Sequence, residues 1–417
     1  MKTIVIGGGA IGLACAFHLQ KAGSEVTVIE ASECGLGASR GNAGWIVPFL
    51  SSPRPGPGAV TAAFKEIRKR DGAVRIRTKL NRSYLSWLID FLQNSTEKKH
   101  RLGTQAMLNF SLNAVESFEK MKEVVPFEFY KEGLLVAALS ESSLHNMVES
   151  HKEMQGYGYN GDGKWIDSKQ LRQMEPALSD KVQAGFHLVD EGHVRPESFL
   201  KGTSQYLKDL GVEILENHPV EKLFFAGANH WNVILKNGET LKADNIVMAA
   251  GAHSKQLLSS IGVSLPMERA KGVSITAQGI GILPKHPLKL LEVNVACTPF
   301  SDSVRLSGTY DIGYDDVEIN PNRLDAVIRN GKQYLRDWNP QKVDFTWAGH
   351  RPVTPDDLPV LGPVPKYEGL FLATGHGTVG LTLAPLTGEM IAAAVCKEMI
   401  VPEMEPFTIQ RFTKIAQ

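Results

Sequence analysis

The sequence lacks several features that would indicate a particular class of protein. Its 417 residues include 45 basic and 45 acidic side chains, so no excess charge favours nucleic acid, and no nucleic-acid-binding motif is present. No run of about 18 apolar residues predicts a transmembrane helix, and no low-complexity tract predicts disorder. The apolar N-terminal stretch is rich in glycine and lacks a small-residue cleavage site. It is therefore interpreted as a strand, turn and helix rather than a secretion signal.

Cysteine is also scarce. The four cysteines are far apart, with no CxxC pair and no ligand-like spacing to histidines, at Cys15, Cys34, Cys297 and Cys396. This pattern is typical of thiols in a reducing cytosol, so we expect a cytoplasmic protein without a bound metal. The length exceeds what one hydrophobic core usually supports, and two domains are therefore expected.

Glycine, in contrast, is abundant, and its first cluster follows a short β-branched strand at residues 3–6. Gly7–Gly12 match the motif G-x-G-x-x-G. The spacing of apolar residues after this motif predicts a helix over 13–22 and a strand over 25–30. In such a unit the first glycine permits a tight turn, the second lets a pyrophosphate approach the backbone, and the third lets the helix pack on the strand. The helix N-terminus offers free N–H groups to the phosphates.

An acidic residue ends the second strand of this unit. Glu30 lies where a carboxylate binds a ribose hydroxyl in dinucleotide-binding folds. Strand, glycines, helix, strand and acid thus occur in the order that dinucleotide binding requires. The cofactor contacts predicted from this unit are Gly7, Gly9, Ala10, Ile11, Gly12, Glu30 and Ala31.

A second loop of small residues follows the acid directly, over 37–44. Such a loop lies along a flavin and its diphosphate without steric conflict, whereas an NAD dehydrogenase usually continues into another helix and strand. The loop therefore favours FAD over NAD. The contacts predicted here are Ser39, Asn42, Ala43 and Gly44.

The remaining pattern alternates helical segments with strand-rich stretches. It predicts an α/β protein with a Rossmann-type FAD-binding domain and an α+β substrate domain whose sheet is mainly antiparallel. We assign the FAD-binding domain to residues 1–86, 191–263 and 344–417. The substrate domain is assigned to residues 87–190 and 264–343.

Residues 53–82 contain nine basic and two acidic residues and open with three prolines. We interpret the segment as a solvated flap that begins as a loop. The alternative interpretation is a peripheral contact with an anionic membrane on its inner face.

Two motifs near the C-terminus complete the candidate site. Pro352 biases Arg351 toward an extended backbone, so that a side chain suited to bidentate pairing with a carboxylate projects from the chain. A salt bridge to Asp356 or Asp357 is the structural alternative. Further on, a loop over 375–381 opens a helix predicted over 384–400, and its N-terminus would stabilise negative charge on a flavin.

These motifs together resemble the D-amino-acid oxidase, glycine oxidase and sarcosine oxidase superfamily, and most closely its bacterial D-amino-acid dehydrogenase branch. The resemblance implies that Arg351 clamps the substrate carboxylate and that Val220, Ala250 and Gly251 border the adenine and diphosphate. It places a cavity-lining residue at Tyr310, where the family often has glutamate. It also places the following residues beside the flavin: Gly375, His376, Gly377, Thr378, Gly380 and Leu381.

The resemblance implies hydride transfer from the α-carbon of a small amino acid to flavin N5, giving an imine and then a keto acid. A D-amino acid is favoured, with Arg351, Tyr310 and His376 as the catalytic candidates. Asn42 stands where relatives with covalent FAD have histidine, so we expect non-covalent FAD. The acceptor is a quinone or oxygen, and a homo- or hetero-oligomer is compatible with the sequence.

Several alternatives stay open at this point. In one alternative, the substrate is glycine, sarcosine or a cyclic imino acid of the D-proline type. In another, the chain is the FAD subunit of a hetero-oligomeric amine oxidase. An NAD(P)-dependent dehydrogenase is disfavoured by the loops at 37–44 and 375–381.

Overall fold

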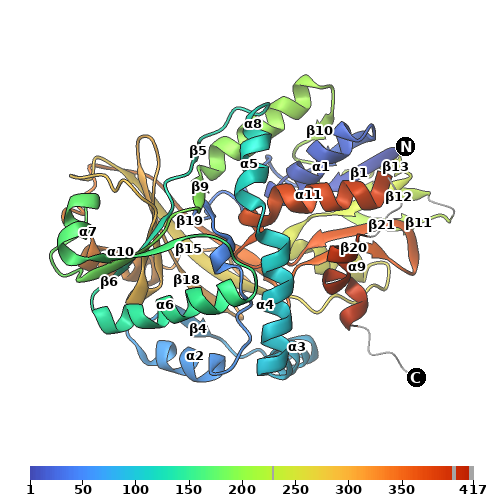
Figure 1. Cartoon of the computed structure of the whole chain (residues 1–417). Coiled ribbons are helices and arrows are strands. Elements are labelled where there is room, and N and C mark those ends of the chain that lie inside the picture. Colours follow the sequence, from blue (N-terminus) through green and yellow to red (C-terminus); the bar gives the residue numbers. More distant parts are fainter. Residues whose placement is uncertain (228–229, 397–400, 413–417) are drawn as a thin grey trace.

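A computed structural model describes residues 1–227, 230–396 and 401–412, and its strands form two large sheets toward opposite ends of the molecule (Figure 1). The predicted helix at 384–400 runs in part outside the described residues, at 397–400. The sequence also predicts a polar turn at 227–230 between two strands, and its residues 228–229 lie outside them as well. The end of the predicted segment 344–417, residues 413–417, also lies outside them.

One large sheet has six strands, and all its neighbouring strands are parallel except the last pair. Its order is β10 (Glu213–Leu215), β2 (Glu25–Ile29), β1 (Lys2–Ile6), β14 (Asn245–Met248), β21 (Tyr367–Thr374) and β20 (Val360–Val364). This confirms the predicted strands at the N-terminus and the Rossmann-type arrangement.

Both faces of this sheet are covered, which explains why its strands are continuous apolar runs. Along β1, Val5 belongs to the core on one face and Ile4 and Ile6 to the core on the other. The first core includes α1 (Ala10–Lys21), α5 (Ala114–Lys122), α8 (Pro196–Asp209) and α11 (Gly380–Cys396). The second includes a small antiparallel sheet of β11 (Val220–Phe225), β12 (Trp231–Leu235) and β13 (Thr240–Ala243).

The other large sheet has nine strands and is mainly antiparallel, as predicted. Its order is β19 (Lys342–Val353), β15 (Glu268–Gln278), β18 (Val304–Ile312), β17 (Val295–Pro299), β16 (Leu288–Leu290), β6 (Leu134–Ala138), β8 (Ala184–Leu188) and β7 (Gly163–Asp167), with β4 (Val74–Ile76) beside β18. Helix α10 (Pro321–Tyr334) packs against β18.

The remaining elements connect and cover the two sheets (Figure 1). The helices are α2 (Ala59–Arg68), α3 (Arg82–Asn94), α4 (Glu97–Ser111), α6 (Glu141–Gly156), α7 (Ser168–Met174) and α9 (Ser254–Ser259). Short 3-10 turns lie at Pro48–Leu50, Gly251–His253, Leu291–Val293, Pro402–Phe407 and Ile409–Phe412. A second small sheet joins β3 (Trp45–Ile46), β9 (Gly192–Val194) and β5 (Phe129–Tyr130).

Two strands pair across the predicted division of the chain. Strand β4 lies within the predicted FAD-binding segment 1–86 but pairs with β18 of the predicted substrate domain. Strand β19 begins before the predicted boundary at 344 and ends after it, and it pairs with β15 on both sides of that boundary. The segment 53–82 is therefore not a continuous loop, because it contains α2 and β4. The division into domains itself stays a prediction.

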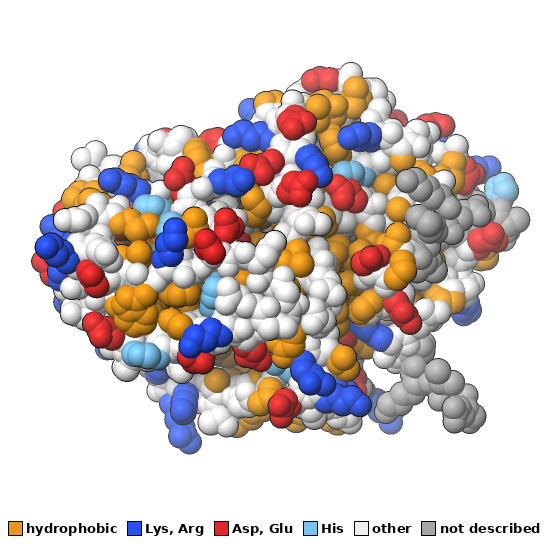
Figure 2. Space-filling model, viewed as in Figure 1, with side chains coloured by type: hydrophobic (Ala, Val, Ile, Leu, Met, Phe, Trp, Pro, Cys, Tyr) orange, Lys and Arg blue, Asp and Glu red, His pale blue; other side chains and the backbone are white. Residues whose placement is uncertain are grey.

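Charged side chains of both signs are interspersed over the face shown in Figure 2, in a chain with equal numbers of each. None of the helices in the described residues is both long enough and apolar enough to span a membrane.

Candidate active site

A cavity of about 1860 Å³ is lined by residues of both large sheets and of the loops between them. Pockets for drug-sized ligands usually measure about 300–1,000 Å³. The cavity therefore has room for a dinucleotide and a small substrate together.

Most of the predicted cofactor residues line this cavity. They are Gly7, Gly9, Ala10, Ile11, Glu30, Ala31, Ser39, Asn42, Ala43, Val220, Ala250, Gly251, His376, Gly377, Thr378, Gly380 and Leu381. Gly12, Gly44 and Gly375 do not line the cavity. They lie close to atoms of other segments, where a side chain would not fit. A Cβ at Gly44 would lie 2.2 Å from the carbonyl oxygen of Val194, and one at Gly375 would lie 3.0 Å from Thr354 Cγ2.

The glycine-rich turn has the geometry that its spacing predicted. Gly7 has φ +115°, and a Cβ there would lie 2.5 Å from the carbonyl oxygen of Ala249. A Cβ at Gly12 would lie 1.8 Å from the carbonyl oxygen of Gly7, so only glycine lets α1 begin this close to β1. The N-cap Gly9 has no side chain to cap α1, and the first amide of the helix, that of Ala10, donates to Ser39 Oγ at 3.0 Å, which leaves the next amides, those of Ile11 and Gly12, without a side-chain cap. These amides and the positive dipole end of the helix therefore suit a phosphate.

Polar atoms around the cavity support an FAD-sized polar ligand. Glu30 Oε2 accepts a hydrogen bond from the Gly8 amide at 2.7 Å, which holds the carboxylate at the cavity wall. Four cavity-lining residues have a buried polar atom without a hydrogen-bond partner in the described residues: Trp45 Nε1, Ser307 Oγ, Thr309 Oγ1 and His350 Nε2. Buried polar groups are normally paired, so these atoms are ready to bind a ligand.

Arg351 reaches the cavity from β19. Its Nη1 donates to the Thr309 carbonyl oxygen at 3.1 Å. Thr309 has φ +65°, which is rare for a β-branched residue and typical of functional sites. A Cβ at Gly272 would lie 2.3 Å from Arg351 Nη1, so this glycine on β15 makes room for the guanidinium. Desolvation and the charge of Arg54 lower the pKa of Arg351 to about 10, and it stays protonated at neutral pH.

Neither acid considered as a salt-bridge partner of Arg351 contacts it. Asp356 pairs with Arg411 at 2.7 Å, and Asp357 pairs with Arg54 at 3.1 Å. Among the described residues, Arg351 has no acidic partner, so its guanidinium is available to a carboxylate ligand.

Tyr310 lies between two arginines. The Cζ atoms of Arg54 and Arg351 are 4.4 and 5.9 Å from its ring centroid. Burial raises the pKa of Tyr310 to about 12, so the hydroxyl remains a neutral donor at the cavity wall.

His376 is buried, and its imidazole is directed toward a helix. Nε2 lies 3.0 Å from Thr387 Oγ1 on α11, and burial lowers the pKa of His376 to about 3. A neutral ring paired in this way favours a contribution from the backbone of the 375–381 loop over acid–base chemistry.

Sequence reasoning missed two cationic side chains at this end of the cavity. Arg54 donates to Asp357 Oδ2 and, at 2.8 Å, to Thr378 Oγ1. Lys289 lines the cavity from β16. Arg54 was hidden by the basic composition of 53–82, and no motif surrounds Lys289.

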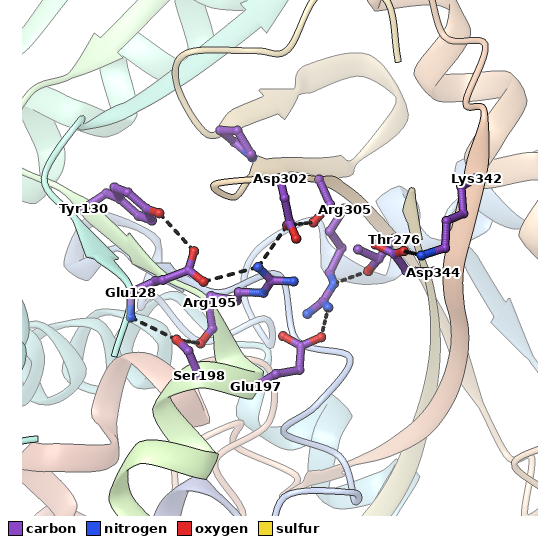
Figure 3. A network of polar contacts seen from close by, with 12 residues as sticks. Glu128, Tyr130, Arg195, Glu197, Ser198, Thr276, Asp302, Arg305, Lys342 and Asp344 are labelled. Atoms are coloured by element: carbon purple, nitrogen blue, oxygen red, sulfur yellow. Dashed lines mark hydrogen bonds and ion pairs between the residues drawn. The ribbon is translucent and has the colours of Figure 1, made fainter. Parts of the chain in front are cut away.

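A buried arginine that sequence reasoning also missed fixes the loop at 37–44. Arg305 on β18 donates through Nη1 to the carbonyl oxygens of Arg40 and Asn42, at 2.9 and 2.8 Å. Its other donors bind Thr276 Oγ1 and the Glu197 carboxylate (Figure 3). The nine-stranded sheet thus holds a cofactor-lining loop in place.

Comparisons with known proteins agree with this geometry. A family model described as "FAD dependent oxidoreductase" matches residues 2–394. The chain is 28% identical over 393 residues to a D-amino acid dehydrogenase of Helicobacter pylori, covering 94% of each, and 30% identical over 430 residues to one of Vibrio atlanticus, covering 99% of this chain and all of the other. Its fold is similar to that of glycine oxidase from Geobacillus kaustophilus, with TM-score 0.77, 20% identity and coverage of 99% and 98%.

Proposed function

Because this chain belongs to the family of FAD-dependent oxidoreductases, we propose that it oxidises a small amino acid, with D-amino acids favoured. The product is an imine, which water hydrolyses to a keto acid and ammonia. The observation that carries the proposal is Arg351, a guanidinium at the cavity wall without an acidic partner in the described residues. The two relatives named D-amino acid dehydrogenase support the choice of stereochemistry.

FAD, when bound, supplies the hydride acceptor for this oxidation. The glycine-rich turn, the start of α1 and Glu30 would hold its nucleotide half, and the loops at 37–44 and 375–381 would hold the rest. Because the chain has Asn42 where covalent attachment would need histidine, we expect acid denaturation to release all the yellow colour from the polypeptide.

The substrate is oriented by the chain's own groups. Arg351 pairs with the α-carboxylate through two parallel hydrogen bonds, and the neutral Tyr310 hydroxyl donates to the same carboxylate. This fixes the α-carbon relative to the cofactor, which is worth several kcal/mol of the barrier in well-oriented sites. The substrate amine nitrogen must lose its ammonium proton before its lone pair can assist oxidation.

The proposal is tested by visible spectra of the purified holoenzyme, recorded anaerobically before and after adding a pool of D-amino acids. Bleaching of the flavin bands is the expected result. Replacing Arg351 with alanine should raise KM and lower kcat/KM by roughly 100-fold or more, since the clamp and its orientation are lost. A flavin that stays oxidised with every amino acid contradicts the proposal and favours an FAD subunit that needs a partner chain.

A membrane quinone is the acceptor that the surface favours. Exposed apolar side chains, including Phe64 at 60% and Leu80 at 94% exposure, lie within the basic segment 53–82, and Phe64 also borders the cavity. Basic residues attract anionic lipids, at about 1 kcal/mol each near the surface. Co-sedimentation with anionic but not neutral vesicles, and dye reduction without peroxide, are expected. Stoichiometric peroxide in air would instead identify oxygen as the acceptor.

A further inference from the structure

The substrate end of the cavity carries more positive charge than one α-carboxylate requires. Arg54, Arg351 and Lys289 all line it. Asp357 neutralises Arg54, but Arg351 and Lys289 have no acidic partner among the residues that the structure describes. Glu66 also borders the cavity, yet its two oxygens are engaged by Lys69 and by the Ala73 amide. Asp311, whose charge acts on Arg351, is itself paired with Arg323, so two cations of this cavity form no ion pair within the described residues.

Lys289 has an environment that a purely structural lysine would avoid. On β16 it lies opposite Val136 of β6 and Ala296 of β17, two strands without charged residues. Burial and the charge of Arg54 lower the pKa of Lys289 to about 8. Lys271 of β15 is a contrasting case, because that buried lysine is paired with Asp316. The Lys289 side chain is partly exposed to the cavity, so a ligand that fills the cavity removes water from an ammonium group without a partner, which is costly unless the ligand carries negative charge.

Resting on the proposed function, we propose that Lys289 binds a carboxylate on the substrate side chain, so that the enzyme acts on acidic amino acids. Arg351 then takes the α-carboxylate, and Lys289 takes the second one. Lys289, Ala296 and Ser307 lie side by side across β16, β17 and β18, and all three line the same cavity as Tyr310 and Arg351. A substrate with two carboxylates would neutralise both unpartnered charges, which a substrate with one cannot do.

The test compares D-glutamate with D-glutamine and D-aspartate with D-asparagine, pairs of nearly equal size that differ in one charge. The holoenzyme should favour the acid over the amide in kcat/KM by about 10-fold or more, which corresponds to one charge-assisted contact. Lys289→Met should remove most of that preference, mainly through KM of the acids, and Lys289→Arg should retain it. Lys332→Met, which changes an exposed lysine of α10, is the matched control.

The pH dependence of the same ratio is a second readout. Lys289 loses its charge as pH rises through about 8, so the preference for the acid should fall there. The second carboxylate of the acid raises the pKa of its own ammonium group above that of the amide, and this effect of the substrate is the same in both proteins. The fall should therefore appear in the wild-type ratio divided by the Lys289→Met ratio. Arg54 and Arg351 stay charged in this range, Tyr310 stays neutral, and nearby Glu292 is engaged by the Tyr334 hydroxyl and the Leu139 amide.

Each outcome decides between the two proposals. Turnover of neutral D-amino acids with an acid-to-amide ratio near one, unchanged by Lys289→Met, overturns the role of Lys289 and leaves the proposed function intact. If no amino acid is turned over, the proposed function fails. Perturbation of the flavin spectrum by glutarate and butyrate then tests Lys289 alone: tighter binding of glutarate that Lys289→Met abolishes supports it, and equal affinities overturn it.

Discussion

Replacing Arg305 with methionine should weaken both the fold and FAD binding. The side chain is 0% exposed and joins β15, β18, α8 and the loop at 37–44 through its hydrogen bonds. Methionine has a similar volume but no donors. The substitution would therefore leave two backbone carbonyl groups and the Glu197 carboxylate without their partner, while changing the packing little.

The expected magnitude follows from burial. Removing one partner of a buried ion pair typically costs about 3–5 kcal/mol. Glu197 retains some contact with water, since 26% of its side chain is exposed, so we expect about 3 kcal/mol in the free energy of unfolding. The Arg305 hydrogen bonds fix the carbonyl groups of Arg40 and Asn42, so FAD binding to the variant would first have to order this loop. Each 1.4 kcal/mol of free energy needed to order the loop lowers FAD affinity by about 10-fold.

Urea unfolding followed by circular dichroism, and FAD titration of the apoprotein, measure the two effects. Arg336→Met is the matched control, because Arg336 is about half exposed and pairs with the exposed Asp180. A surface pair of this kind contributes about 0–1 kcal/mol. If Arg305→Met changes neither quantity more than Arg336→Met does, the buried network does not hold the loop.

Three further predictions follow from other parts of the molecule. Gly272→Ala places a Cβ 2.3 Å from Arg351 Nη1 and displaces the guanidinium, so kcat/KM in steady-state kinetics should fall by roughly 100-fold while FAD affinity is retained. The control is Gly156→Ala, where a Cβ meets open space, and equal kinetics of the two variants would contradict the prediction. Gly12→Ala forces a Cβ to 1.8 Å from the Gly7 carbonyl oxygen, so the protein should purify without bound flavin, and a yellow variant would refute the packing argument. Burial raises the pKa of Glu191 to about 8, against the hydrogen bonds from Tyr159 and the Phe49 amide. The unfolded carboxyl ionises near 4.5, so the free energy of unfolding should decrease as pH rises from about 4.5 to 8, by a few kcal/mol at most. Melting curves of Glu191→Gln should show a smaller decrease, and parallel pH profiles would exclude Glu191 as the cause.

The nucleotide half of the site could be predicted because its parts are close in sequence. A tight turn between β1 and α1 needs glycines at fixed spacing, and the next strand brings Glu30 to the same edge of the sheet. The start of α1 was predicted three residues late, after Gly12. Glycine has low helix propensity, but the contact of Gly12 with the Gly7 carbonyl requires it inside the first turn.

The segment 53–82 shows where composition misleads. Its prolines and basic residues indicated a solvated flap that begins as a loop. Helix α2 has no buried residue, in keeping with a solvated segment, but the pairing of β4 with β18, more than 200 residues away, was not predicted. Pairing over such a distance depends on what the rest of the fold leaves open at the sheet edge. Local sequence patterns carry no signal of that kind.

The residues at the substrate end of the cavity come from distant parts of the sequence. Arg54 and Asp357 are 303 residues apart in sequence, and Arg351, Tyr310 and Lys289 come from three different strands. Backbone geometry builds the cofactor site, so it tolerates few substitutions. Side chains from separate strands supply the charged groups of the substrate end, so a relative with the same fold can change its substrate by exchanging one of them without disturbing the cofactor. Lys289 is a position where such an exchange should disturb the fold little, because its neighbours on both adjacent strands are apolar and its ammonium group forms no ion pair within the described residues.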